Sequence, residues 1–316
     1  MPHLSRASAL GLIAAGAAAL PRAARAQSAP GQLRIGSVPA DTYAGGYYAL
    51  DTGLFDKAGL SVQITPFANG AAMAAAVAGG SLDLGIGDAT ELANGVSRGI
   101  PFVLIAGGGL YSTNAPTTTL CVSKTSPIVR AADLEGQTLA VVSLVSLQSA
   151  GVKSWLAQNG ADLTKIHFVE LPFPSMPGAL ERGTIAAATL SEPIMSDALN
   201  TDAKIFCKPF DAIAKQFLIS DWFTTRDWLA KNGDVAKRFV GAIYDAARWA
   251  NAHHDDSAAI LAKYTKIDVD RIRRMNRTVC ATDLQRAMVQ PVLDTAFKYQ
   301  ALATATDAST LIAKGF

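Results

Sequence analysis

The sequence predicts an α/β protein made of two open-sheet lobes. Short β-like runs alternate with longer helical runs over most of the chain, the pattern of βαβ units on a mainly parallel sheet. The 316 residues allow two domains, because single cores stop growing near ~250–300 residues. A weak repeat, 76–85 against 179–188, places a helix end, a glycine turn and a short buried strand in each copy. Two lobes of similar design would leave such a repeat.

The expected elements follow in order along the chain. A strand over 33–38 leads into a glycine-rich loop over 41–46 and a helix running from 47 to 59. Further strands are predicted over 60–67, 82–86, 102–106, 117–122, 139–142, 166–171 and 186–190. Helices are predicted over 71–78, closed by Gly79-Gly80, and over 91–97, 147–158 and 178–182. The last third is expected to be helical, over 234–252, 257–264, 269–275 and 282–302, with Asp234 and Ser257 as N-caps.

The first residues predict export. Arg6 precedes an apolar run over 7–20, and Ala24-Arg25-Ala26 places small residues before Gln27. This arrangement is typical of a secretory signal peptide over 1–26, cut after Ala26. A membrane anchor is the alternative, but the run is shorter than the ~20 residues of a span. We therefore expect a periplasmic protein, with 27–32 as a short linker.

Composition excludes several classes of function. The net charge is +2 without a concentrated basic run, so no nucleic-acid partner is expected. Three cysteines and four histidines are too few for a metal cluster, and neither a metal nor a cofactor is expected. His253-His254-Asp255-Asp256 is interpreted as a solvated loop between two helices. Cys121 and Cys207 flank the second lobe, and the sequence leaves open whether they form a disulfide or stay reduced.

Several short motifs occur in a characteristic order. They are Tyr48-Ala49 with Gly53-Leu54-Phe55, Gly59-Leu60-Ser61-Val62, Gly80-Ser81-Leu82-Asp83-Leu84-Gly85, Gly99 to Val103, Asp133-Leu134-Glu135-Gly136-Gln137 and Gly183 to Pro193, ending in Glu192-Pro193. Together, over 33–265, they resemble the periplasmic binding proteins of ABC importers for taurine, alkanesulfonates, nitrate and thiamine-pyrimidine precursors. Ala186 departs from the family pattern, which has an aspartate there.

The resemblance implies a type II periplasmic binding protein with two open-sheet lobes joined by a two-stranded hinge. Lobe 1 is expected to contain 33–116 plus 211–316, and lobe 2 is expected to contain 117–210. The chain would cross between them near 117–122 and 205–210. The implied partners are a small-molecule ligand and an ABC permease in the inner membrane, and we expect a monomer.

Ligands of open α/β sheets bind beyond the carboxyl ends of the strands, which selects two loops in lobe 1. In the loop over 41–46, Asp41, Tyr43 and Gly45 are candidates, with backbone N–H groups for an anion and Tyr43 as an aromatic wall; a plain turn is the alternative. In the second loop the candidates are Asp88, Ala89 and Thr90. Asp88 is either an N-cap only or also a group that repels anions and favours ligands with amines or N–H donors.

Two further loops belong to lobe 2. Ser143 and Ser146 lie between a strand and a helix, where Ser146 as N-cap leaves N–H groups free for an anion. Glu192, held before Pro193, is a candidate acceptor for ligand donors or a brace of the hinge. Possible apolar lining residues, with core packing as the alternative, are Phe173, Met176, Trp222 and Phe223.

The sequence thus predicts a binding protein rather than an enzyme, because it contains no nucleophile elbow, zinc-protease, phosphate-loop or dinucleotide motif. A ligand-sensing subunit of a membrane receptor and a thiamine-pyrimidine synthase-like enzyme remain as alternatives. Because Arg and Lys are scarce in all four loops, a neutral or singly charged organic ligand, such as an aromatic compound or an N-heterocycle, is expected over a doubly charged anion.

Overall fold

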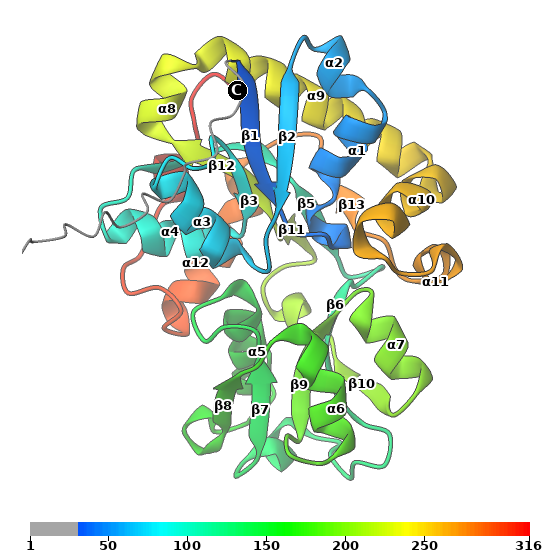
Figure 1. The fold of residues 1–316 in the computed structure, drawn as a ribbon. Helices are drawn as coiled ribbons and strands as arrows, with labels where there is room; N and C mark the ends of the chain where they lie inside the picture. Colours follow the sequence, from blue (N-terminus) through cyan, green and yellow to red (C-terminus); the bar gives the residue numbers. More distant parts are fainter. Residues whose placement is uncertain (1–30) are drawn as a thin grey trace, which may run out of the picture. The chain divides into compact units, whose positions relative to one another are not determined.

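The structure is a computed structural model that describes residues 31–316 (Figure 1). The predicted signal peptide, 1–26, lies outside these described residues. Between residues 31 and 316, no helix combines the length and apolar character needed to cross a membrane.

The described chain alternates strands and helices, which confirms the predicted α/β class. The strands are β1 (Gln32–Ser37), β2 (Ser61–Pro66), β3 (Gly85–Gly87), β4 (Phe102–Gly107), β5 (Gly109–Ser112), β6 (Thr118–Ser123), β7 (Thr138–Val141), β8 (His167–Glu170), β9 (Ala187–Ser191), β10 (Ala203–Cys207), β11 (Gln216–Leu218), β12 (Asp221–Thr225) and β13 (Val279–Cys280).

The α-helices are α1 (Gly45–Asp51), α2 (Leu54–Lys57), α3 (Gly70–Ala78), α4 (Ala89–Ser97), α5 (Leu147–Gln158), α6 (Met176–Glu181), α7 (Ile194–Asn200), α8 (Arg226–Lys231), α9 (Gly233–Ala252), α10 (His254–Thr265), α11 (Val269–Arg274), α12 (Arg286–Lys298) and α13 (Ala308–Leu311). Short 3₁₀ helices are η1 (Asp41–Tyr43), η2 (Ala131–Leu134), η3 (Leu163–Lys165), η4 (Phe173–Ser175) and η5 (Pro209–Ala212).

Strands from distant parts of the chain form the first main sheet. β1 pairs with β2 in parallel, and a parallel bridge between Ile35 and Leu84 connects β1 with the segment that enters β3. β12 lies between β3 and β4 and runs antiparallel to both. The strand order is therefore β2-β1-β3-β12-β4, which we call sheet I.

The second main sheet repeats this order. Its strands are arranged β8-β7-β9-β6-β10, with β7 parallel to β8 and β9, and with β6 antiparallel to β9 and β10. We call it sheet II. The two segments of the sequence repeat, 76–85 and 179–188, lead into or occupy the third strands of the two sheets, β3 and β9. The repeat thus reflects a topology that both sheets share.

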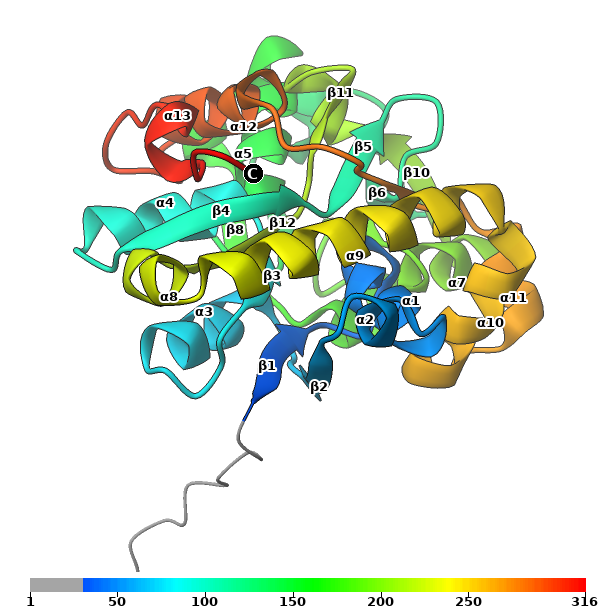
Figure 2. The ribbon, with the colours of Figure 1, turned by 90° about the horizontal axis from the view of Figure 1, so that it is seen from above.

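The sheets are stabilised by apolar side chains on both faces. In β6, Leu120 and Val122 pack into one core with Leu139 and Val141 of β7, whereas Cys121 packs into a second core on the opposite face. This alternation follows from the two-residue period of a strand. Sheet I is buried in a larger core that includes Trp222. A third sheet, of order β11-β5-β13, connects to this core, and α9 packs against α1 and β4 (Figure 2).

Several predicted elements differ from the structure. The loop over 41–46 is instead η1 and the start of α1, and the helix over 47–59 is two short helices separated at Gly53, whose φ is 69°. α9 begins after Asn232 rather than at Asp234, and α10 begins at His254, so Ser257 is buried inside a helix. The last third is not purely helical, because β11, β12 and β13 supply strands to two sheets. These strands are short, and their pairing partners lie far away in the sequence.

Each main sheet draws on its own part of the chain, while the lobe boundaries at residues 117 and 210 stay a prediction. Sheet II uses only residues from 118 to 207, while sheet I and the small sheet use residues from 32 to 112 and from 216 to 280. The two predicted crossings, near 117–122 and 205–210, contain β6 and β10, which are antiparallel neighbours. The division into lobes that move as separate bodies stays a prediction.

Candidate binding site

A cavity of about 520 Å³ lies where strands of both sheets end. From sheet I it is lined after β1 by Val38, after β2 by Asn69 and after β3 by Asp88. From sheet II it is lined after β7 by Ser143, after β8 by Phe173 and at the end of β9 by Ser191. The carboxyl ends of three parallel strands from each sheet therefore converge on one space, as expected for a ligand site of open α/β sheets.

The sequence-predicted site residues divide into two groups. Five line the cavity: Tyr43, Asp88, Ser143, Ser146 and Glu192. Four do not: Asp41, Gly45, Ala89 and Thr90. The last two form the buried first turn of α4, directly behind Asp88. Ligand contact by any of the nine stays a prediction.

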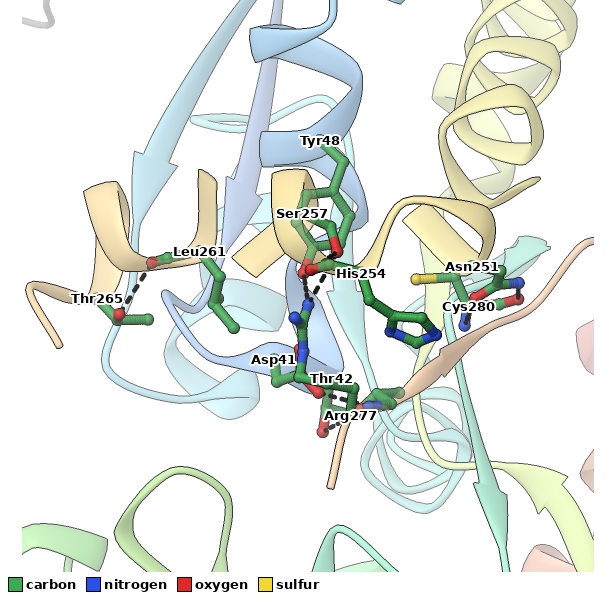
Figure 3. Close-up of polar contacts among 11 residues, drawn as sticks. Asp41, Thr42, Tyr48, Asn251, His254, Ser257, Leu261, Thr265, Arg277 and Cys280 are labelled. Carbon is green, nitrogen blue, oxygen red and sulfur yellow. Dashed lines mark hydrogen bonds and ion pairs between the residues drawn. The ribbon is translucent and has the colours of Figure 1, made fainter. Parts of the chain in front are cut away.

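Asp41 instead belongs to a buried polar cluster beside the cavity (Figure 3). Arg277 Nε donates to Asp41 Oδ1 at 2.8 Å, and the backbone N–H of Thr278 donates to Oδ2 at 2.5 Å. Arg277 Nη2 also donates to the hydroxyl of Tyr48 at 2.7 Å. Both carboxylate oxygens of Asp41 are therefore occupied by protein groups. The sequence offered no signal for this cluster, because Arg277 follows Asp41 by more than 230 residues.

Tyr43 is positioned by hydrogen bonds to the backbone of η1. Ser37 Oγ donates to the carbonyl of Tyr43 at 2.8 Å, and Ser220 Oγ donates to the carbonyl of Thr42 at 2.9 Å. Burial raises the pKa of the Tyr43 phenol, and the negative charges of Glu91 and Asp88 raise it further. The ring thus forms a neutral aromatic wall.

Asp88 is the N-cap of α4, as one interpretation of the sequence predicted. Its Oδ1 accepts from the N–H groups of Thr90 and Glu91 at 2.8 and 3.1 Å. Burial raises the pKa of Asp88 to about 6, while hydrogen bonds from backbone N–H groups, including that of Leu147 in the first turn of α5, oppose this rise. The carboxylate therefore lies close to the N-terminus of a helix that follows sheet II.

Glu91 lines the cavity beside Asp88 and was missed by the sequence analysis. A Cβ at Gly70 would lie 2.3 Å from Glu91 Oε2, so the glycine leaves room for the carboxylate. Burial and the charge of Asp88 raise the pKa of Glu91 to about 8. The position of Glu91 three residues after Asp88 was the available sequence signal for this site. The same spacing is also typical of an ordinary capping box at the start of a helix.

The two other acidic side chains of the lining have protein partners. Glu170 Oε1 accepts from the N–H of Leu144 at 2.7 Å. Glu192 accepts from the backbone N–H and the hydroxyl of Ser196 at 3.1 and 2.9 Å, and burial raises the pKa of Glu192. Both glutamates thus help to fix the ends of strands in sheet II.

Ser146 is the N-cap of α5, as predicted. The N–H of Ser149 donates to Ser146 Oγ at 3.3 Å, and Ser146 Oγ donates to the carbonyl of Ser143 at 2.7 Å. In the same first turn of α5, Gln148 Nε2 donates to Ser191 Oγ at 3.4 Å, while its buried Oε1 has no partner in the described part of the chain. Gln148 belongs to the lining of the cavity.

Of the four predicted apolar lining residues, only Phe173 lines the cavity. Met176, Trp222 and Phe223 are buried in the cores, which confirms their alternative interpretation as core residues. Phe210 and Ile219 contribute further apolar lining.

The cysteine and histidine predictions have separate outcomes. Cys121, Cys207 and Cys280 are free and buried, so no disulfide joins β6 to β10. His253 stacks on Trp249 between α9 and α10, but His254, Asp255 and Asp256 form the first turn of α10 rather than a loop. Across residues 31–316, no group of three or more His, Cys, Asp or Glu residues is arranged to hold a metal ion.

A family model described as NMT1/THI5 like matches residues 41–257. The structure is similar to that of the periplasmic aliphatic sulphonate-binding protein SsuA from Escherichia coli, with a TM-score of 0.74, 21% identity and coverage of 90% of this chain and 93% of that one. It is also similar to the periplasmic nitrate-binding protein NrtA from Synechocystis PCC 6803, with a TM-score of 0.71, 15% identity and coverage of 88% and 84%.

An enzyme shares this architecture. The desulfurization enzyme DSZB matches with a TM-score of 0.64, 15% identity and coverage of 90% of this chain and 96% of that one. No curated protein matches the sequence. The structural likenesses show that the chain has the same fold as these proteins, and the resemblance drawn from the sequence motifs is confirmed at the level of the family.

Proposed function

Because the chain belongs to the NMT1/THI5 like family, we propose that it is an exported solute-binding protein that captures a small organic molecule and delivers it to an ABC importer. The observation that carries this proposal is the cavity at the converging strand ends of sheets I and II, with a volume of about 520 Å³. This size falls in the range of ~300–1,000 Å³ that is typical of small-molecule sites. Apolar walls and a few polar groups complete the usual composition of such a site.

Binding rather than catalysis is supported by the residues of the lining. The residues that line the cavity include no cysteine and no histidine, the side chains that most often act as nucleophile or general base. The acidic pair Asp88 and Glu91 is the remaining candidate for acid–base chemistry. A ligand that is recovered unchanged after long incubation, as judged by mass spectrometry, supports binding, whereas a converted product supports an enzyme.

The mechanism we propose is closure about β6 and β10. A ligand that contacts both sheets lowers the free energy of the closed arrangement, and the closed form then docks on the permease. Small-angle scattering should show a decrease in the radius of gyration when a ligand binds. Binding without compaction would contradict the mechanism.

Transport is tested in the source organism. Deleting the gene should abolish uptake of the bound solute, and the protein should be recovered from the periplasmic fraction. Ala71→Trp places a large side chain in the lining, so it should fail to restore uptake. Ala72→Trp is the matched control, because Ala72 is exposed on the same helix, α3, and lies outside the lining. Equal rescue by both variants would exclude the cavity as the transport site.

A ligand-sensing role is the second outcome of the same experiment. If uptake is intact without the gene while the response of the cell to the solute is lost, the protein serves a receptor rather than an importer.

A further inference from the structure

The lining of the cavity carries one sign of charge. Four carboxyl side chains belong to it, those of Asp88, Glu91, Glu170 and Glu192, whereas no Lys, Arg or His does. The buried Arg277 lies outside the lining; its Nε and Nη2 are engaged by Asp41 and Tyr48, while its Nη1 has no partner within residues 31–316. A ligand in this cavity therefore meets carboxyl groups and no cationic side chain of the lining.

The acidic groups differ in how far the protein satisfies them. Glu170 and Glu192 accept hydrogen bonds from N–H and hydroxyl groups of sheet II. The carboxylate of Glu91 has neither a hydrogen bond nor an ion pair within residues 31–316, and it lies against Gly70 in the wall of the cavity. A half-buried carboxylate without a partner is costly, and a ligand that donates to it removes that cost.

A carboxyl group of the protein lies near the N-terminus of α5. The carboxylate of Asp88 lies near the N–H of Leu147, the first residue of that helix. A helix N-terminus attracts negative charge, and here a negative side chain of the protein already faces it. An anionic ligand at this helix end would lie close to the carboxyl groups of Asp88 and Glu91.

The lining also contains aromatic side chains and a glutamine side chain. Tyr43, Phe173 and Phe210 belong to the lining, as does Gln148, whose buried Oε1 has no partner in the described residues. Aromatic faces and acceptor oxygens together suit an organic cation, because cations are attracted to ring faces and donate to carboxylates.

We infer that the ligand of this cavity is an organic cation, with a protonated amine or amidine that binds Asp88 and Glu91 and an apolar body that packs against Tyr43, Phe173 and Phe210. The inference rests on the proposed function. It also separates this chain from the sulphonate-binding and nitrate-binding proteins that share its fold, since those names denote anions.

The test uses matched sets of a cation, a neutral isostere and an anion. Ring compounds are represented by benzamidine, benzamide and benzoate, and chain compounds by pentylamine, pentanol and pentanoate, with larger sets of both kinds up to the size of the cavity. Binding is measured by calorimetry on the protein from residue 27 onward. We expect the cation of a set to bind at least tenfold more tightly than its isosteres. A tighter neutral or anionic member, or no binding by any cation, would overturn the inference.

Two variants locate the charge. Glu91→Gln and Asp88→Asn preserve shape, and asparagine still caps α4, so both should fold. Each should weaken the best cation by about tenfold or more, as expected for a lost charge-assisted hydrogen bond. Glu181→Gln, an exposed change on α6 outside this lining, is the control and should leave affinity unchanged. Unchanged affinity in both site variants would place the cation elsewhere.

The outcomes distinguish the inference from the proposed function. An anion that binds in the cavity and is imported overturns the inference and leaves the function intact. A cation that binds with the expected loss in Glu91→Gln, but whose uptake does not depend on the gene, supports the inference and contradicts delivery to an importer.

Discussion

At the scale of single residues, Glu91 shows how a binding group can oppose stability. Burial and the charge of Asp88 raise its pKa to about 8, so the folded protein holds this proton more tightly than the unfolded chain does. The contribution of Glu91 to stability is therefore greatest below its unfolded pKa near 4.5 and is lost as the pH rises through about 8. The nearby titratable groups, Asp88, Asp221 and Tyr43, supply no positive charge that would reverse this trend.

Glu91→Gln should consequently stabilise the protein without ligand at alkaline pH. We expect a gain of about 1–3 kcal/mol at pH 8 that shrinks towards zero near pH 4.5. Urea unfolding at several pH values measures it, with Glu181→Gln as the control. A gain that is the same at all pH values would show that charge is not the cause.

Unlike the charge of Glu91, the buried ion pair between Arg277 and Asp41 should stabilise the folded protein. The two side chains are 10% and 2% exposed. Removing the arginine leaves a buried carboxylate without its partner, so Arg277→Ala should lower the free energy of unfolding by about 3–5 kcal/mol. Arg286→Ala breaks an exposed pair with Asp307 and should change it little. Chemical denaturation compares the two, and a similar loss in both variants would contradict a special role for the buried pair.

The residue-scale predictions from the sequence had a physical limit. Asp88, Ser146 and Glu192 could be placed near the cavity because strand ends and N-caps are local features. Asp41 was predicted to contact the ligand because its actual partner, Arg277, is remote in sequence and could not be matched to it. Glu91 was missed because the direction of its side chain depends on the space left by Gly70.

At the scale of elements, close approach of the backbone explains Gly107. This residue ends β4, and a Cβ there would lie 2.4 Å from the backbone oxygen of Asp283 and 2.9 Å from Ala281. Contacts this short would push the segment that precedes α12 away from sheet I. The strand and the segment it contacts are far apart in sequence, so a pattern search could not find this constraint.

Gly107→Ala should therefore destabilise the protein by about 1–3 kcal/mol, the usual effect of overpacking. Gly233→Ala is the matched control, because a Cβ at the first residue of α9 meets nothing within 4 Å. It should be neutral or slightly stabilising, since alanine restricts the unfolded chain more than glycine does. Thermal unfolding measures the stability of both variants. Equal melting temperatures for the two variants would refute the explanation.

The sequence predicted four of the five strands in each main sheet and missed β10 of sheet II and β12 of sheet I. β6 to β9 have local periodicity and follow one another in the chain. β12 enters sheet I between β3 and β4 from more than 100 residues further along the chain. Its partners are set by the tertiary packing of Trp222 and Phe223, which local periodicity does not encode.

At the scale of the whole molecule, the repeated strand order suggests two bodies that meet at the cavity. A direct contact also connects them, besides β6 and β10. Arg271 of α11 forms an ion pair with Asp197 of α7. α7 packs on sheet II, while α11 packs on α10. The Arg271–Asp197 pair therefore joins elements of the two predicted lobes and should favour the closed arrangement.

Reversing one charge tests this role. Arg271→Glu should widen the distribution of distances between spin labels on Ala72→Cys of α3 and Glu181→Cys of α6, because two negative charges then face each other. Combining it with Asp197→Arg should restore the narrower distribution. Arg273→Glu, on the same helix, is the control, because Arg273 pairs with Asp255 and Asp270 on α10 and α11. If Arg271→Glu leaves the distances unchanged, or if the reversed pair fails to restore them, the ion pair does not control closure and the hinge strands alone must set the opening equilibrium.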